Sequence, residues 1–276
     1  MLKYGEIIEL ALREDLGTLR DITSRSIFSK ESISKAIIIA KEAGIIVGMD
    51  VVREVFHYIN SDLRVDAFAE DGDYVTAQTE LFVIEGSTIS ILEGERVALN
   101  ILGHLSGIAT TVKEYVKIIE GTGVKILDTR KTLPGLRALE KYAVLMGGGI
   151  NHRMGLYDMI LIKDNHIEAV GGITNAVNKV RESYSNDFFI EVEVRNIKEV
   201  DDAMKCSVDR ILLDNMSLDA MREAVKLVNG KISLEASGNV NIKNVRDIAE
   251  TGVNFISIGA ITLSSRALDV SLKIIK

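Results

Sequence analysis

The sequence has a single cysteine, Cys206, among its 276 residues. One cysteine excludes an internal disulfide and a C-x-x-C metal or redox motif, and it is compatible with a reducing compartment. Basic residues are also few, since 33 lysines and arginines stand against 40 aspartates and glutamates and give a net charge of −7. This balance argues against a nucleic-acid-binding protein, which would carry a basic excess.

Long apolar runs are missing as well. No stretch approaches the ~20 uncharged apolar residues of a membrane span, and charged residues interrupt the opening MLKYGEIIELALREDLG. A secretory signal peptide would have an uninterrupted apolar centre at that place. We therefore expect a cytoplasmic protein that is neither secreted nor membrane-spanning.

What is present is typical of a soluble globular chain, with 47% hydrophobic and 26% charged residues. After a helix-like opening, β-rich runs broken by glycines occupy residues 36–48 and 80–94. From Glu95 the apolar positions recur every three or four residues as far as Ile119, which predicts one long helix or two consecutive helices. We place a domain boundary near Gly107, between an N-terminal α/β domain (1–106) and a second domain (107–276).

The second domain repeats a unit in which a short apolar run is followed by a stretch of helical character. Successive runs start 21 to 34 residues apart, which is the length of a βα unit, and they are VKILDTR (124–130), DMILIKD (158–164), FFIEVEV (188–194), DRILLDN (209–215), ISLEASG (232–238) and NFISIGA (254–260). Nearly continuous apolar runs are typical of parallel strands buried on both faces. The repeat predicts an α/β barrel or an open doubly wound sheet.

Polar or small residues close these runs, and the active site of a barrel lies at the C-terminal ends of its strands. The residues concerned are Asp128, Arg130, Lys131, Lys163, Asp164, Glu191, Glu193, Asp214, Asn215, Glu235, Ser237 and Gly259. Any one of them is also explained by a strand that stops where polarity begins. Six such ends together, with alternation at Glu191 and Glu193, favour a common site.

The segment between Lys125 and His166 reverses the charge of the protein. It has seven basic and four acidic residues, a local charge of +3. Such a segment favours an anionic ligand, and arginine binds carboxylate or phosphate through two hydrogen bonds. Arg137 and Lys141 flank Glu140 in a helix that we expect between Pro134 and Gly147, and we interpret both as mostly solvated.

Two further groups of residues suggest the ligand. His152 and Arg153 follow a triple glycine; a lone histidine is often a packing residue, but the neighbouring arginine favours an anion contact. Glu193 and Asp214 end successive strands and could hold a phosphate-bound metal or stabilise positive charge. The alternative is that these carboxylates form ion pairs with Lys163 or Arg195. Small residues at 236–239 and 257–260 are suited to phosphate, so a phosphorylated sugar fits.

In their order along the chain, these segments resemble the quinolinate phosphoribosyltransferases. The resemblance covers nearly the whole chain, including residues 14–24 and 94–110, and it is carried by TRKTLPGLRALEKYAV, GGGINHRMGLYDMILIKDNHI, EVEV, LLDN, EASGN and ISIGA. It implies an N-terminal α/β sandwich domain, an incomplete barrel of about seven strands, and a C-terminal tail able to pack on the N-terminal domain. It also implies a homodimer or higher homo-oligomer.

The implied reaction converts quinolinate and phosphoribosyl pyrophosphate to nicotinate mononucleotide, pyrophosphate and carbon dioxide in NAD biosynthesis, with magnesium. By resemblance, the quinolinate carboxylates contact Arg130, His152, Arg153 and Lys163, and Arg96 reaches over from the neighbouring chain. The phosphoribosyl and pyrophosphate side is implied for Lys131, Glu193, Asp214, Ser237, Gly238, Asn239 and Gly259. Thr129, Ile258 and Ala260 are further implied as substrate-binding residues. Lys163, Glu193 and Asp214 are the candidate catalytic residues; the pyrophosphate mainly holds Mg²⁺, with Glu193 and Asp214 as candidate ligands. The final proton donor is Lys163 with water, or His152.

The sequence departs from the family pattern in two places. Leu263 stands where the family usually has histidine, so a phosphate contact is missing or is replaced by Ser264, Ser265 or Arg266. In the N-terminal signature, Leu19, Arg20 and Asp21 stand in part for the usual glycine and aspartate. These changes bear on the affinity for phosphoribosyl pyrophosphate.

Three alternatives stay open at this point. A related phosphoribosyltransferase could act on another base, although a monocarboxylate would not need both the TRKT and the NHR clusters. An aldolase could form a Schiff base on Lys163, at a strand end. A non-catalytic metabolite-binding protein is the third, and Leu263 is its support.

Overall fold

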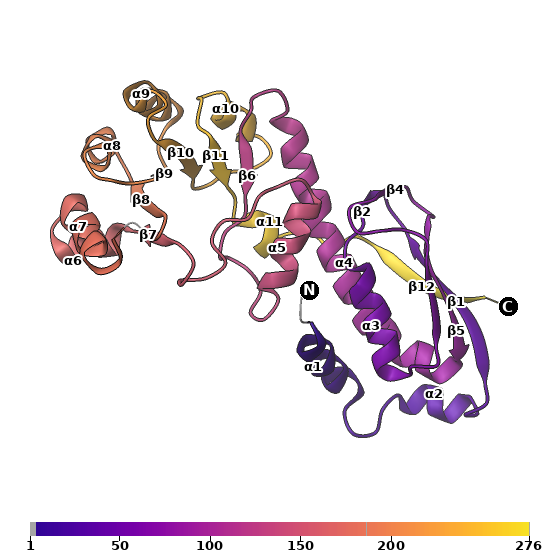
Figure 1. Cartoon of the computed structure of the whole chain (residues 1–276). Helices are drawn as coiled ribbons and strands as arrows, with labels where there is room; N and C mark the ends of the chain where they lie inside the picture. The colour runs from indigo at the N-terminus through magenta and orange to yellow at the C-terminus, as the bar shows by residue number, and fades with distance from the viewer. Residues whose placement is uncertain (1–3, 186, 276) are drawn as a thin grey trace. The chain divides into compact units, whose positions relative to one another are not determined.

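A computed structural model describes residues 4–185 and 187–275, and its chain divides into two compact units (Figure 1). Unit 1 comprises residues 1–113, 133–148 and 264–276, and unit 2 comprises 114–132 and 149–263. The units therefore do not divide at a single point of the chain, and Gly107 lies inside a helix of unit 1.

Unit 1 contains a four-stranded antiparallel sheet in the order β12-β1-β5-β3. Its strands are β1 (Ile33–Ala40), β3 (Arg64–Ala67), β5 (Glu80–Ser87) and β12 (Val270–Ile275). The C-terminal strand pairs with β1 through Ala36 and Ile274, so the C-terminal end of the described chain joins a sheet made otherwise of strands before residue 88. A smaller antiparallel pair joins β2 (Gly44–Ile45) and β4 (Tyr74–Val75).

Five helices accompany these sheets in the described part of unit 1. They are α1 (Gly5–Leu16), α2 (Ile22–Ile27), α3 (Met49–Ile59), α4 (Thr88–Ile118), whose last turn belongs to unit 2, and α5 (Arg137–Met146). Asp21 caps α2, because its carboxylate accepts from the N–H groups of Thr23 and Ser24 and so satisfies the free end of the helix. In α3 the apolar side packs inward, with Val52, Val55 and Phe56 fully buried.

The expected long helix is a single element, α4, whose apolar stripe includes the buried Val97, Leu105, Ile108 and Val112. It starts earlier than predicted, so the β-rich interpretation of residues 88–94 is wrong. Packing of this turn overrides the strand preference of its β-branched residues. In the middle of α4, a Cβ on Gly107 would lie 2.0 Å from the carbonyl oxygen of Arg266, so only glycine allows that close approach.

Unit 2 is built on six parallel strands in the order β6-β11-β10-β9-β8-β7. Each predicted apolar run contains one of them: β6 (Lys125–Leu127), β7 (Ile160–Ile162), β8 (Ile190–Val194), β9 (Arg210–Asp214), β10 (Ser233–Ser237) and β11 (Phe255–Ser257). A single parallel bridge between Leu127 and Ile150 extends the sheet beyond β6, in place of a full seventh strand. The incomplete α/β barrel is thus confirmed.

Helices follow the strands of unit 2, as in successive βα units (Figure 1). They are α6 (Asp164–Val170), α7 (Ile173–Tyr184), α8 (Ile197–Met204), α9 (Leu218–Val228), α10 (Val245–Ala249) and α11 (Ala260–Leu263). No helix within residues 4–185 and 187–275 is both long and apolar enough to cross a membrane.

The two faces of the parallel sheet differ in chemistry. Ile211, Leu213 and Ala236 alternate along β9 and β10 and are fully buried on one face. The residues between them in sequence point to the opposite face, which carries the polar groups Glu191, Glu193, Arg210, Asp214, Glu235 and Ser237. This polar face is where the candidate site lies.

One prediction about α5 is wrong. Lys141 is only 1% exposed and Glu140 is completely buried, whereas Arg137 is half-buried. The carboxylate of Glu140 lies 2.8 Å from Nε2 of His104 and accepts from the N–H of Leu133. The side of α5 that we took as solvated therefore belongs to the interior of unit 1.

Candidate functional site

The C-terminal ends of the parallel strands bring most of the predicted residues to one edge of the sheet of unit 2. Glu193 lies in β8, Asp214 and Ser237 end β9 and β10, and Lys163 directly follows β7. Residues 129–131 follow β6, and residues 258–260 follow β11. This edge is the usual active-site location in α/β barrels.

Two arginines at this edge lie close enough to repel each other. The pKa of Arg153 is lowered, first by burial and then by the charge of Arg130. Nη1 of Arg153 donates to the carbonyl oxygen of Met159 at 3.1 Å, which fixes the guanidinium. An anion between two such groups would relieve their repulsion.

Asp128 holds the loop that carries His152 and Arg153. Its carboxylate is completely buried; Oδ1 accepts from the N–H of His152 at 2.8 Å and Oδ2 from Nδ2 of Asn151 at 2.6 Å. The sequence indicated Asp128 as one of the polar residues at the strand ends, without a role of its own. Its only signal in the sequence is its place directly after a strand, before Thr129 and Arg130.

Lys163 and Glu193 form an ion pair, with Nζ 2.5 Å from Oε2. This is the alternative that the sequence left open for Glu193, and it joins two candidate catalytic residues. Arg195, the other proposed partner, instead pairs with Asp164. The Lys163 side chain is 44% exposed and that of Glu193 is 10% exposed, so the lysine is the more accessible member.

The main chain around Lys131 is fixed by two threonines. The N–H of Lys131 donates to Oγ1 of Thr129 at 3.0 Å, and the hydroxyl of Thr262 donates to the carbonyl oxygen of Lys131 at 2.6 Å. A Cβ on Gly259 would lie 2.7 Å from Cδ of Lys131. The absence of a side chain at Gly259 therefore leaves room for the side chain of Lys131. Next to it, the N–H of Ile258 donates to the carbonyl oxygen of Leu127 at 3.0 Å.

Left-handed backbone shapes the ends of β9 and β10. Asn215, Gly238 and Asn239 have φ values of 53°, 96° and 51°. Nδ2 of Asn239 donates to Oδ1 of Asn215 at 2.9 Å, and a Cβ on Gly238 would lie 2.2 Å from that oxygen. Nδ2 of Asn215 in turn donates to Oδ2 of Asp214 at 3.0 Å. Turns of this kind present backbone N–H groups to anions such as phosphate.

The residues at the two sequence departures have partners within unit 1. Ser265 bonds to Thr111 at 2.9 Å, and Arg266 pairs with Glu42 at 2.5 Å, whereas Leu263 in unit 2 is 53% exposed. Arg20 has a φ of 60° and joins Arg25 in binding Glu93. The Glu93 side chain is 1% exposed, so this ion pair compensates a buried charge.

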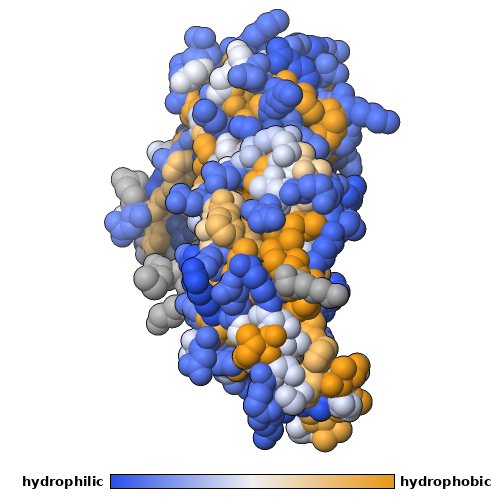
Figure 2. Space-filling model, turned by 90° about the vertical axis from the view of Figure 1, so that its right-hand side faces the viewer, coloured by the Kyte–Doolittle hydropathy of each residue, from blue (hydrophilic) through white to orange (hydrophobic). Residues whose placement is uncertain are grey.

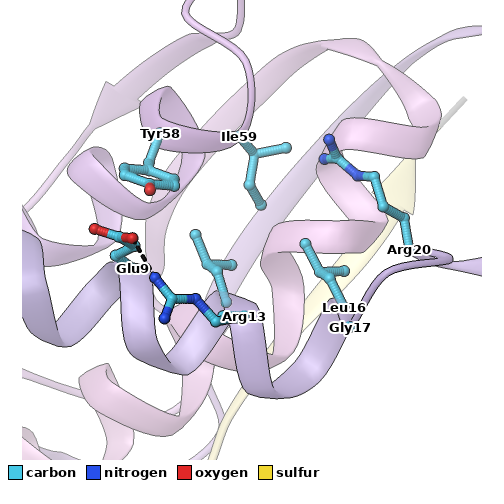
Figure 3. Close-up of a pocket in the computed structure, with 8 residues that line it drawn as sticks. Glu9, Arg13, Leu16, Gly17, Arg20, Tyr58 and Ile59 are labelled. Atoms are coloured by element: carbon cyan, nitrogen blue, oxygen red, sulfur yellow. Dashed lines mark hydrogen bonds and ion pairs between the residues drawn. The ribbon is translucent and has the colours of Figure 1, made fainter.

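Arg96 belongs to the other unit. It lies on α4, where its side chain is 63% exposed and 3.8 Å from Glu95. Unit 1 also contains a shallow pocket of about 250 Å³ between α1 and α3 (Figure 3). Two of its lining arginines are already paired, Arg13 with Glu9 and Arg20 with Glu93, and none of the predicted site residues lines it.

A buried polar cluster lies on the same sheet face. Nε2 of His152 is 2.9 Å from Oε2 of Glu191 and 3.7 Å from Oε2 of Glu235, and Nη1 of Arg210 is 2.9 Å from that same Glu235 oxygen. The sequence indicated both glutamates but not Arg210, which begins its strand. The pKa of Glu235 is raised to about 7, chiefly by burial and then by the charge of Glu191, against the opposing effects of His152, Ser257 and Arg210.

This cluster could offer three metal ligands, since atoms of His152, Glu191 and Glu235 lie within 4.8 Å of one another. Its imidazole and carboxylates do not suit Mg²⁺, which prefers oxygen ligands and keeps several waters. The guanidinium beside Glu235 also disfavours a second cation there.

Family models match almost the whole chain. The model of the quinolinate phosphoribosyl transferase N-terminal domain matches residues 21–106, and that of the C-terminal domain matches residues 108–273. The chain belongs to the quinolinate phosphoribosyltransferase family. The two matches meet at Gly107.

Similar members of the family come from plants and bacteria. The chain is 42% identical to quinolinate phosphoribosyltransferase (decarboxylating) 2b, mitochondrial, of Nicotiana tabacum, over 98% of this chain and 81% of that protein. It is 45% identical to a probable nicotinate-nucleotide pyrophosphorylase (carboxylating) of Synechocystis sp., over 86% and 82%. The crystal structure of nicotinate-nucleotide pyrophosphorylase from Ehrlichia chaffeensis matches with a TM-score of 0.96 at 43% identity, covering 99% of each chain.

The raised pKa of Glu235 predicts a pH-dependent stability. A carboxyl whose pKa rises from 4.5 to about 7 on folding stabilises the fold most fully below pH 4.5. We expect this contribution, roughly 3 kcal/mol, to be lost as the pH rises from about 4.5 to 7. Glu235→Gln keeps an acceptor for Arg210 but cannot ionise, so its free energy of unfolding in urea should fall less over this range. Equal pH slopes for the two proteins would contradict the prediction.

Proposed function

We propose that this chain is a decarboxylating quinolinate phosphoribosyltransferase. It would convert quinolinate and phosphoribosyl pyrophosphate to nicotinate mononucleotide, pyrophosphate and carbon dioxide, a step of NAD biosynthesis. The observation that carries the proposal is the position of Arg130, Arg153 and the Glu193-paired Lys163 directly after successive parallel elements, at the C-terminal edge of one sheet. A dicarboxylate is the kind of ligand that such a group of cations binds.

Quinolinate is assigned to the cationic part of the site. Arg130, Arg153 and Lys163 would bind its two carboxylates, with His152 beside them. Arginine suits this task because its planar fork matches a carboxylate. The burial that lowers the pKa of Arg153 would also strengthen its attraction to a carboxylate.

The phosphoribosyl group is assigned to the neighbouring strand ends. The left-handed turns support phosphate binding there, and so does the space at Gly259 that seats Lys131. The residues concerned are Thr129, Lys131, Glu193, Asp214, Ser237, Gly238, Asn239, Ile258, Gly259 and Ala260.

The reaction needs little covalent chemistry from the protein. The pyridine nitrogen bonds to the anomeric carbon of ribose as the bond from that carbon to pyrophosphate breaks. Positive charge grows on the ribose in the transition state, where Glu193 and Asp214 would stabilise it. With the ring nitrogen cationic, the bond to the adjacent carboxylate breaks, carbon dioxide leaves, and the electron pair stays on the ring carbon. Lys163, through water, would then supply a proton to that carbon. His152 is the other candidate donor, but both of its ring nitrogens are already in hydrogen bonds.

Magnesium fits this site as a partner of the substrate. Glu193 and Asp214 offer carboxylate oxygens, which Mg²⁺ prefers, and two such groups bind it mainly together with substrate phosphates. When bound, the ion would neutralise charge on the leaving pyrophosphate. The carboxylate of Asp214 is oriented for such a role by Asn215.

We further propose a homodimer or higher homo-oligomer in which Arg96 serves the site of a neighbouring chain. An exposed arginine on α4 is accessible to another subunit. Apolar patches lie among hydrophilic side chains on the face seen in Figure 2. Leu19, Ile22, Ile27 and Ile33 of unit 1 are between 63% and 75% exposed, and exposed apolar groups of this kind are typical of interfaces.

The cytoplasm is the proposed compartment, because the one cysteine, Cys206, is free. Relatives from plants are named as mitochondrial or chloroplastic.

The Schiff-base alternative is disfavoured by the contact of Lys163. A Schiff base needs a free amine, whereas Nζ here is bound to the carboxylate of Glu193. Exposed Leu263 affects one strand end only, and the cations, the paired carboxylate and the left-handed turns are in place without it.

The proposed reaction can be tested directly. With quinolinate, phosphoribosyl pyrophosphate and Mg²⁺, the purified chain should release carbon dioxide and form nicotinate mononucleotide, and removal of Mg²⁺ by a chelator should abolish turnover. Nicotinate in place of quinolinate should give no product. Binding of both substrates without turnover would instead support a non-catalytic protein, and borohydride trapping of a keto substrate would support an aldolase.

Arg153→Ala should raise the KM for quinolinate ~10²-fold or more, and we expect the same of Arg130→Ala. The loss of a charged hydrogen-bonded partner costs up to ~3 kcal/mol. Steady-state kinetics with each substrate varied in turn would measure this effect. Arg222→Ala is the control, because Arg222 pairs with Asp219 on α9. Unchanged quinolinate kinetics in both site variants would refute the carboxylate assignment.

The role of Arg96 can be tested by subunit mixing. Arg96→Ala and a variant inactive in the same chain's own site, such as Glu193→Ala, should each have little activity. Mixed dimers would contain one site with neither change, so activity should partly return on mixing. No recovery, with subunit exchange verified by tagged chains, would count against a shared site.

A further inference from the structure

The ring of His152 is bound at both of its nitrogen atoms. The N–H of Arg153 donates to Nδ1 at 2.7 Å. A nitrogen that accepts a hydrogen bond carries no proton, so the proton of the neutral ring lies on Nε2. Nε2 is 2.9 Å from Oε2 of Glu191, which accepts that proton in a hydrogen bond. The two hydrogen bonds together thus define the tautomer of the ring, and the carboxylate of Glu191 holds its orientation.

Glu191 is itself surrounded by fixed groups. Strand pairing sets it beside Arg210 on β9, and Arg210 donates to Glu235 on β10 at 2.9 Å. The guanidinium of Arg210 lies 5.3 Å from the ring centre of Phe189 and 4.1 Å from that of Phe255. Aromatic faces attract a cation at such distances, so Arg210 has little freedom to move.

This cluster is costly for a purely structural element. Glu191 and Glu235 are both completely buried, and Oε1 of each has no hydrogen-bond partner among the described residues. Burial raises the pKa of Glu191, and a buried polar atom without a partner loses its hydrogen bonds to water without replacement. Apolar side chains of similar size would pack there at no such cost. The position therefore indicates a functional role.

We propose that Glu191 is a positioning residue for quinolinate binding, which acts through the ring of His152 on the main chain of Arg153. The carboxylate orients the ring, and Nδ1 of the ring holds the N–H of Arg153. Arg153 must stay near Arg130 despite their repulsion, so its fixed main chain preserves the geometry of the anion site. The inference rests on the proposed function.

A metal ion is the competing occupant of the cluster. It would need Nε2 of His152 without its proton, and it would lie close to the cation of Arg210. Both requirements conflict with the contacts seen, so the structure favours the hydrogen-bonded arrangement. Metal binding is kept as an outcome of the test.

The first experiment compares Glu191→Ala with Glu191→Gln. Alanine removes the acceptor for Nε2–H, and we expect the KM for quinolinate to rise ~10-fold while the KM for phosphoribosyl pyrophosphate and kcat change less than about twofold. Glutamine keeps an oxygen acceptor, so most of the affinity for quinolinate should return. Parallel changes in both KM values, no change in either, or a glutamine variant as weak as the alanine variant would each overturn the proposal.

Val192→Ala is the matched control, because Val192 is the next residue of β8 and lies buried on the opposite face of the sheet. It should lower the melting temperature without a selective effect on quinolinate. A selective rise of the quinolinate KM in this variant too would mean that any damage to β8 has that effect, and it would overturn a specific role for Glu191.

A second measurement uses the wild-type protein and therefore does not depend on the folding of a variant. In protein labelled with ¹⁵N-histidine, NMR should find His152 protonated on Nε2 and unprotonated on Nδ1, with zinc uptake measured by elemental analysis in parallel. The opposite tautomer, or one zinc ion per chain, would overturn the proposal. If the wild-type protein does not turn over quinolinate, the proposed function fails while the tautomer result still stands by itself.

Discussion

Cations can gather at the edge of the parallel sheet because carboxylates lie among and beneath them. Arg130 and Arg153 repel each other, and Lys163 adds a third charge at the next strand end. Asp128 holds the loop of Arg153 through its backbone, and Glu193 pairs with Lys163. Without these anionic partners, like charges would separate into solvent. With them, the group keeps one geometry and a net attraction for a polyanion.

The alternation of the strands decides which carboxylates serve this purpose. In β8, Glu191 and Glu193 share one face, but only Glu193 lies near the mouth of the sheet, while Glu191 is completely buried. Glu193 pairs with the partly exposed Lys163, and Glu191 contacts His152. Two glutamates that are only two residues apart on one face of a strand therefore have different environments.

The strands of unit 2 and the helix α4 could be predicted from the sequence. A continuous apolar run indicates a strand buried on both faces, and apolar residues at every third or fourth position indicate a helix buried on one side. Residues 88–94 were misread because β-branched residues there pack in a helix, and local propensity does not contain that information. Lys141 was misread for a related reason: its burial depends on contacts of unit 1 that are distant in sequence.

The resemblance pointed to most residues of the candidate site, and the βα repeat explains why they meet at one edge. Apart from the ion pair of Glu193 with Lys163, which the sequence left open, the partners of those residues could not be predicted. Arg210 stands at the start of its strand, and only the register of β9 with β8 and β10 brings it to Glu235 and beside Glu191. The tautomer of His152 likewise follows from two hydrogen bonds that no motif specifies.

The pairing of β12 with β1 has a consequence for synthesis on the ribosome. Unit 1 draws on residues 1–113, 133–148 and 264–276, so its sheet lacks an edge strand until the whole of unit 2 has been translated. One edge of β1 therefore stays unpaired until β12, at the C-terminal end of the chain, has been synthesised. Such long-range closure slows folding and leaves the nascent chain open to association with other chains.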